Sequence, residues 1–122
     1  MVAADIESGG VFLASIEGEP AATLRFQLSD DLFWPDVPSG EAAFIHRLAV
    51  RRRYAGSGLS SALFHWSADR AARLGRQFLR LDCEHSRTKL RGIYERFGFR
   101  WHSNRRVGPF FVARYEYPVG GA

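Results

Sequence analysis

The segment best suited to chemistry is a loop with two glycines, Arg53-Tyr54-Ala55-Gly56-Ser57-Gly58. Alternating residues precede it and a helical period begins at Leu59, so the loop should join a strand to a helix. The first amides of a helix have no internal partner and lie at the positive end of its dipole. Glycines let that backbone approach a bulky anion, and Arg53 would add a charged contact. The pattern predicts a pyrophosphate cradle, although an ordinary strand-to-helix turn could contain the same two glycines.

The segments around this loop predict a strand–helix–strand unit. Residues 43–50 alternate as in a strand, which would place His46, Leu48 and Val50 on one face together with Phe44. A helix should follow and end near Gly75, with an apolar stripe of Leu59, Ala62, Leu63, Trp66 and Leu74. Residues 78–83 are predicted to form the next strand. A helical crossover of this kind joins parallel strands.

The rest of the chain predicts antiparallel strands and one more helix. Residues 11–16 and 22–28 should form a hairpin about residues 17–20. The acidic, proline-containing segment 29–40 should be a loop anchored by Phe33 and Trp34. A helix through Leu90, Ile93, Tyr94 and Phe97 should end at Gly98, and residues 99–102 and 110–117 should be strands with a loop at 104–109. The predicted fold is α+β: one domain over 1–122 whose mixed sheet has a central parallel pair and antiparallel ends.

Composition restricts the classes of partner. The 122 residues are 46% hydrophobic and 25% charged, as in a globular domain, and no apolar run is long enough to span a membrane. A single cysteine, Cys83, excludes an intrachain disulfide and favours a cytoplasmic location; a buried, inert thiol is expected there. The net charge is +4, and arginine supplies 16 of the 17 basic residues, which suits phosphate binding. The longest basic run, residues 51–53, is too short to indicate a nucleic-acid partner.

Two motifs in this order resemble the GNAT superfamily of N-acetyltransferases. The first is His46-Arg47-Leu48-Ala49-Val50 leading into the glycine loop, and the second is Tyr94-Glu95-Arg96-Phe97-Gly98-Phe99. The resemblance covers residues 43–99. It implies an acetyltransferase that uses acetyl-CoA as cosubstrate, without a metal, and a small-molecule or peptide amine as acceptor.

The resemblance also implies where the coenzyme lies. In the family the strand before the loop splays from its parallel neighbour, and the pantetheine arm occupies the gap. The pantetheine amides would then pair with the backbone of Leu48, Ala49 and Val50. The pyrophosphate would meet Arg53 and the loop amides, which belong to Tyr54, Ala55, Gly56, Ser57, Gly58, Leu59 and Ser60. At Arg87 this chain departs from an asparagine that is common in the family and contacts the pantetheine, so that contact is not expected to be the same.

Three residues are the candidates for proton transfer. The resemblance implies that Tyr94 gives a proton to the departing thiolate, although its place in an apolar stripe also suits a core aromatic. His46 matches a histidine thought to relay the amine proton in some members, and imidazole titrates near neutrality; a packed or coenzyme-side histidine is the equal alternative. Asp82, at the end of its strand, is the second candidate base. We expect direct attack by the amine rather than an acetyl-cysteine at Cys83.

The chain would also lack the N-terminal strand and helices that wall the acceptor site in many GNAT proteins, because the first predicted strand begins near residue 11. A homodimer could complete that wall. Four loop acids (Asp30, Asp31, Asp36 and Glu41) suggest a cationic amine, unless they are simply solvated.

Two other functions remain open. One is a dinucleotide-binding module, because Gly56, Gly58 and Asp82 partly mimic that fingerprint, although Ser61 stands where a third glycine belongs. The other is a non-catalytic coenzyme-sensing or nucleic-acid-binding protein of similar fold.

Overall fold

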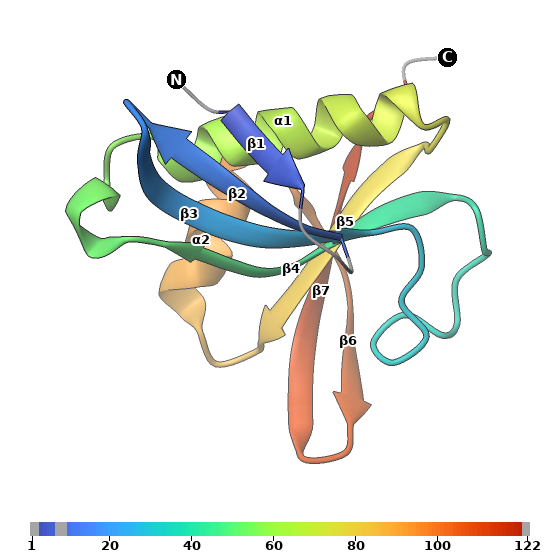
Figure 1. Cartoon of the computed structure of the whole chain (residues 1–122). Coiled ribbons are helices and arrows are strands. Elements are labelled where there is room, and N and C mark those ends of the chain that lie inside the picture. Colours follow the sequence, from blue (N-terminus) through green and yellow to red (C-terminus); the bar gives the residue numbers. More distant parts are fainter. Residues whose placement is uncertain (1–2, 7–9, 121–122) are drawn as a thin grey trace.

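The computed structural model describes residues 3–6 and 10–120, which form one sheet with two α-helices (Figure 1). Its strands are β1 (Ala3–Ile6), β2 (Val11–Ile16), β3 (Glu19–Gln27), β4 (Ala42–Val50), β5 (Phe78–Glu84), β6 (Arg100–Val107) and β7 (Phe110–Pro118). The helices are the 3-10 turn η2 (Arg52–Tyr54), α1 (Leu59–Arg73) and α2 (Thr88–Phe97). None of the described helices is long and apolar enough to cross a membrane.

The sheet has the order β1-β2-β3-β4-β5-β7-β6, and only β4 and β5 are parallel. The remaining neighbours are antiparallel. This confirms the predicted α+β class with a central parallel pair. It also removes the dinucleotide-binding alternative, since that fold needs a mostly parallel, doubly wound sheet.

Two expectations about the strands were wrong. The chain does have an N-terminal strand, because β1 pairs with β2 from Ala3↔Ser15 to Ile6↔Phe12; four residues are too few to give an alternation signal. The expected loop at 104–109 is mostly strand, because β6 continues to Val107 and only a tight turn at Gly108 precedes β7. Pairing with β7 stabilises that polar segment as an edge strand, which its composition alone did not predict. Among the described residues, no α-helix precedes β2.

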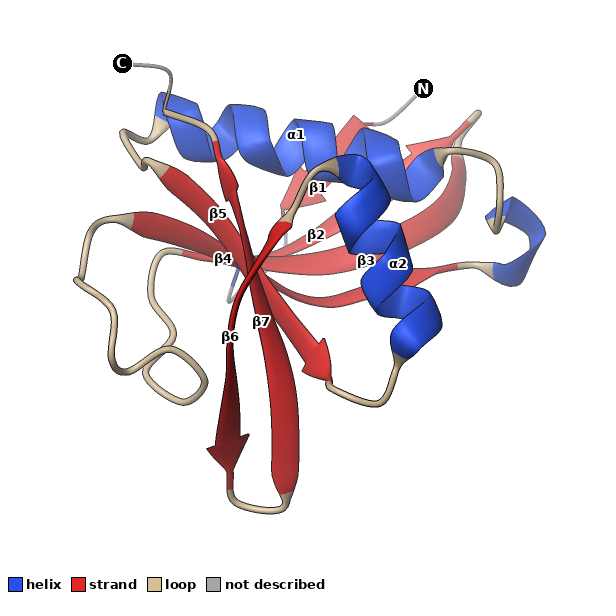
Figure 2. Cartoon of the chain, turned by 180° about the vertical axis from the view of Figure 1, so that it is seen from behind, coloured by secondary structure: helices blue, strands red, loops and turns tan. Residues whose placement is uncertain are grey.

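Both α-helices pack against the same face of the sheet (Figure 2). Leu59, Leu63 and Phe64 of α1 form one buried cluster with Leu79 and Leu81 of β5. Burying each such side chain contributes about 1.5–3 kcal/mol. As predicted, α1 ends just before Gly75, which adopts the left-handed φ of +79°. Leu74 was expected in the buried stripe but lies beyond the helix and is exposed.

The opposite face of β4 is covered by the loop between β3 and β4. Trp34 of this loop is buried against Ala42 and Phe44, which alternate with the helix-side residues of β4. The guanidinium groups of Arg80 and Arg114 lie 5.3 Å and 4.6 Å from the Trp34 ring centre. The predicted anchoring role of Trp34 is therefore confirmed, and it fixes the loop that lies beside β4 and β5.

Candidate active site

A β-bulge at Arg47 determines which way the β4 side chains point. Arg47 has a φ of +53°, and the register with β3 shifts by one residue between the pairs Thr23↔Ala49 and Arg25↔His46. A bulge adds one residue and so reverses the alternation of side chains. The expectation that His46, Leu48 and Val50 share a face was therefore wrong: Leu48 and Val50 pack on the helix-side core, while His46 contacts the loop on the other face.

The strands β4 and β5 separate soon after they meet. They pair only at Ala42↔Phe78, Ala43↔Leu79 and Phe44↔Arg80, although both strands continue for several residues. Beyond these pairs lies a cleft of about 790 Å³. Among the residues that line it are the predicted site residues His46, Leu48, Asp82, Arg87 and Tyr94. Side chains from three elements thus meet where the sheet opens.

The glycine loop presents free amides at the start of α1. Gly56 and Gly58 have φ of +76° and +86°, and no side chain caps the helix. The amides of Tyr54, Ala55 and Ser57 are used in turn hydrogen bonds within the loop. Within the described residues, four other loop amides have no acceptor, namely those of Gly56, Gly58, Leu59 and Ser60. The donor set therefore suits a diphosphate, while Arg53 is exposed with its guanidinium 5.1 Å from the Tyr54 ring centre.

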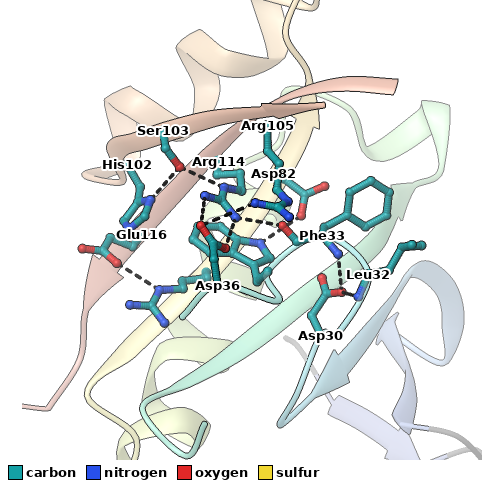
Figure 3. Close-up of polar contacts among 12 residues, drawn as sticks. Asp30, Leu32, Phe33, Asp36, Asp82, His102, Ser103, Arg105, Arg114 and Glu116 are labelled. Atoms are coloured by element: carbon teal, nitrogen blue, oxygen red, sulfur yellow. Dashed lines mark hydrogen bonds and ion pairs between the residues drawn. The ribbon is translucent and has the colours of Figure 1, made fainter. Parts of the chain in front are cut away.

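Asp30 belongs to a polar cluster in the cleft, and no sequence pattern distinguished it from the other loop acids. Its Oδ1 accepts hydrogen bonds from the amides of Leu32 (3.1 Å) and Phe33 (2.9 Å), as Figure 3 shows. Its Oδ2 lies 3.1 Å from Nε2 of His46. Burial alone would raise the pKa of Asp30, but the bonds to His46 and Phe33 outweigh it and lower the pKa. Asp30 is therefore a fixed carboxylate beside the imidazole.

Asp82 completes this cluster. Its Oδ2 accepts a hydrogen bond from Nε1 of Trp34 at 3.1 Å (Figure 3). Burial raises the pKa of Asp82, and the nearby His46 and the Trp34 bond offset this only in part. Polar atoms of Asp30, His46 and Asp82 all lie within 4.8 Å of one another. Such a set can accept a proton or hold a cation, and its donor types suit an ammonium group or a divalent metal ion.

Tyr94 is both a core residue and a cleft residue. Its buried ring packs edge-on against Phe64, Phe99 and Tyr115, with centroids 5.7–6.0 Å apart. Burial raises the pKa of Tyr94, so the hydroxyl stays protonated at neutral pH and has a proton to give. Cys83 also lines the cleft, and burial raises the pKa of its thiol to about 11. Cys83 is thus a poor nucleophile near neutral pH.

Two of the other loop acids are used by the fold. Asp36 accepts two hydrogen bonds from Arg114, at 2.7 Å and 3.0 Å, and lies 3.6 Å from Arg105 (Figure 3). Glu41 binds Arg80 at 2.7 Å. Of the four loop acids suggested by the sequence, only Asp30 lines the cleft, where Asp82 and Glu84 of β5 are the other acidic residues of the lining.

The family model named "Acetyltransferase (GNAT) family" matches residues 3–99 of the chain. The chain belongs to the GNAT acetyltransferase family. Its resemblance to that family, inferred from the two motifs, is confirmed. The Bacillus subtilis protein YesJ, described as an uncharacterized N-acetyltransferase, is 31% identical over 102 residues, which are 80% of this chain and 57% of that relative.

Solved structures agree on the fold. A GNAT-family acetyltransferase from Listeria monocytogenes superposes with a TM-score of 0.76 at 24% identity, over 89% of this chain and 64% of that one. YncA from Salmonella typhimurium, solved with its cofactor acetyl-CoA, gives a TM-score of 0.69 at 14% identity, over 92% and 65%. The chain thus spans less than two thirds of the length of these relatives.

Proposed function

We propose that this protein transfers an acetyl group from acetyl-CoA to a primary amine by direct attack in a ternary complex. One observation carries the proposal: the splayed gap between β4 and β5 has a polar cluster of His46, Asp30 and Asp82 on one side and the Tyr94 hydroxyl in its lining. At the end of β4, the uncapped α1 offers the free amides of the glycine loop. A diphosphate-bearing thioester and an amine would find complementary groups here.

The coenzyme would be held by backbone more than by side chains. Its diphosphate would bind the free amides of Gly56, Gly58, Leu59 and Ser60 at the positive end of α1. Its pantetheine arm would lie along residues 48–50 of β4, which have no strand partner on the β5 side. When bound, the coenzyme supplies an activated acetyl thioester.

Side chains on the two sides of the gap between β4 and β5 would carry out the proton transfers. An amine arrives as an ammonium ion, and His46 would take its proton directly or through a water, with Asp30 holding the imidazole. Asp82, whose pKa is raised, is the second candidate base. The amine nitrogen then bonds to the acetyl carbon as the carbon–sulfur bond breaks, and Tyr94 would give its proton to the leaving sulfur. The second proton that the nitrogen loses on becoming an amide would return to the Tyr94 oxygen, directly or through water.

A thiol-release assay with acetyl-CoA and a panel of primary amines tests the proposal, with mass spectrometry of the acetylated amine as the second readout. Gly56→Val should abolish coenzyme binding in calorimetry, because a valine resists the φ of +76° and fills the approach to the amides. Gly40→Val is the matched control: it has a φ of +81° and equally open surroundings, but lies outside the site.

Two results would contradict the proposal. Unchanged coenzyme affinity in Gly56→Val would contradict the assignment of the glycine loop as the binding site. Tight coenzyme binding with no turnover on any amine would favour the non-catalytic, coenzyme-sensing alternative. The expected homodimer and cytoplasmic location stay predictions.

A further inference from the structure

Among the described residues that line the cleft, Arg25 has a buried donor atom, Nε, that has no hydrogen-bond acceptor. Asp30 also lines the cleft, but its Oδ2 already lies 3.1 Å from Nε2 of His46. Other buried atoms of the described residues also lack partners, but those side chains do not line the cleft. An unsatisfied buried donor is costly, so a bound anion that accepts hydrogen bonds from the Arg25 guanidinium would be favoured.

The register of the sheet places these groups side by side. Arg25 pairs with His46 across β3 and β4, and directly opposed residues of antiparallel strands point to the same face. Arg25 therefore lies on the face of β4 that carries the His46–Asp30 cluster, away from the two helices. A ligand whose amine meets His46 would have its next few atoms within reach of the Arg25 guanidinium.

Arg25 is also a half-buried cation of the cleft lining, and no carboxylate of the described residues forms an ion pair with it. Two comparably placed arginines of the sheet, Arg80 and Arg114, each bind carboxylates. None of the ion pairs among the described residues involves Arg25. Arg47 and Arg87 line the same cleft but are exposed to solvent. The guanidinium fork of Arg25 matches a carboxylate in geometry as well as in charge.

The mouth of the cleft adds an apolar wall. Leu32 and Phe110 line it and remain 63% and 51% exposed. Phe33 lies beside Phe110, with ring centroids 6.3 Å apart, and Val112 continues the wall inward. Exposed apolar side chains next to a polar cluster are typical of a ligand site.

We propose that the acceptor is a free amino acid with an apolar side chain, an inference that rests on the proposed acetyl transfer. Its amine would bind Asp30, His46 and Asp82, and its carboxylate would bind Arg25. Its side chain would lie against the wall formed by Leu32, Phe33, Phe110 and Val112. A simple alkylamine or the lysine of a peptide would leave Arg25 without an anion.

Three probes that share a phenyl ring separate these contributions: L-phenylalanine, phenethylamine and 3-phenylpropanoate. Calorimetry with the full chain in the presence of free coenzyme A should show L-phenylalanine binding on the order of 10- to 100-fold more tightly than either single-charge analogue, because one charge-assisted contact is then added. Acetylation should follow the same preference in kcat/KM. Phenethylamine binding as tightly as L-phenylalanine would overturn the inference.

Arg25→Met keeps the length of the side chain and removes the fork. It should abolish the preference for L-phenylalanine while leaving phenethylamine binding unchanged. Arg76→Met is the matched control, because Arg76 also has a buried, unpartnered Nε but does not line the cleft. A preference that survives in Arg25→Met overturns the inference, and so does an equal loss for all three probes.

The two proposals can fail separately. If amines are acetylated without regard to a carboxylate, the inference is wrong and acetyl transfer stands. If none of the three probes binds, the inference is wrong, and turnover on the amine panel decides acetyl transfer separately. If L-phenylalanine binds in an Arg25-dependent way but no amine is acetylated, the amino-acid site is supported and the proposed reaction is wrong.

Discussion

Replacing Tyr94 with phenylalanine separates its two roles, since the ring stays and only the hydroxyl is lost. The ring makes the contacts with Phe64, Phe99 and Tyr115, and phenylalanine preserves them. The hydroxyl belongs to a residue that lines the cleft, and no hydrogen bond to another described residue contributes to its pKa shift. We therefore expect the free energy of unfolding of Tyr94→Phe to stay within about 0.5 kcal/mol of the native value.

The kinetic effect should be much larger. General acid catalysis is typically worth about 10²- to 10⁴-fold in rate, which is about 2.7–5.4 kcal/mol of activation free energy. Burial raises the pKa of Tyr94, so the native acid is protonated throughout the neutral range. The loss in kcat should thus be the same at every pH near neutrality, with little change in coenzyme affinity.

Tyr115→Phe is the matched control. The Tyr115 hydroxyl donates to Glu95 at 2.6 Å and accepts from Arg91 at 2.9 Å, and Tyr115 does not line the cleft. Removing it should cost about 0.5–1.5 kcal/mol of stability, because the half-buried Arg91 and the exposed Glu95 each lose one hydrogen bond, and kcat should be unchanged. Single-turnover kinetics with acetyl-CoA and thermal unfolding measure both quantities. Native single-turnover rates in Tyr94→Phe would refute the assigned acid.

Three further outcomes are expected. His46→Gln keeps a polar group beside Asp30 but cannot take a proton, so kcat should fall by about 10²- to 10⁴-fold. A native rate would indicate that Asp82, and not His46, is the general base. Cys83→Ala should retain kcat, because burial raises the thiol pKa to about 11; a folded but inactive variant would instead indicate a covalent route. The Arg114 bonds lower the pKa of Asp36, so their stabilisation is present above about pH 4 and is lost as the pH falls below that. Asp36→Asn should accordingly lower the free energy of unfolding by about 1–2 kcal/mol at pH 7, a value reduced because the carboxylate is half-exposed. The loss should be smaller in acid, and chemical denaturation at both pH values measures it.

The order of elements could be predicted from the sequence because each signal is local. The glycines at 58, 75 and 98 have positive φ values where a helix begins or ends, and apolar periodicity identified α1 and α2. The two motifs also identified the family and placed Tyr94, His46 and Asp82 among the site candidates. Residues 3–6 and 104–107 were misassigned, since short or polar strands depend on pairing with a neighbour rather than on their own pattern.

Local sequence thus determined which α-helices form, where the glycine loop lies and which family the protein belongs to. Only the tertiary structure decided the direction of the side chains after Arg47, because the bulge there is defined by pairing with β3. It also decided that Asp30, and not Asp36 or Glu41, faces the cleft, since arginines from β5 and β7 bind the other two. The pairing of Arg25 with His46 is likewise a matter of register. Contacts between residues far apart in the chain produce no periodic pattern in the sequence, so they are defined only once the strands have paired in the folded sheet.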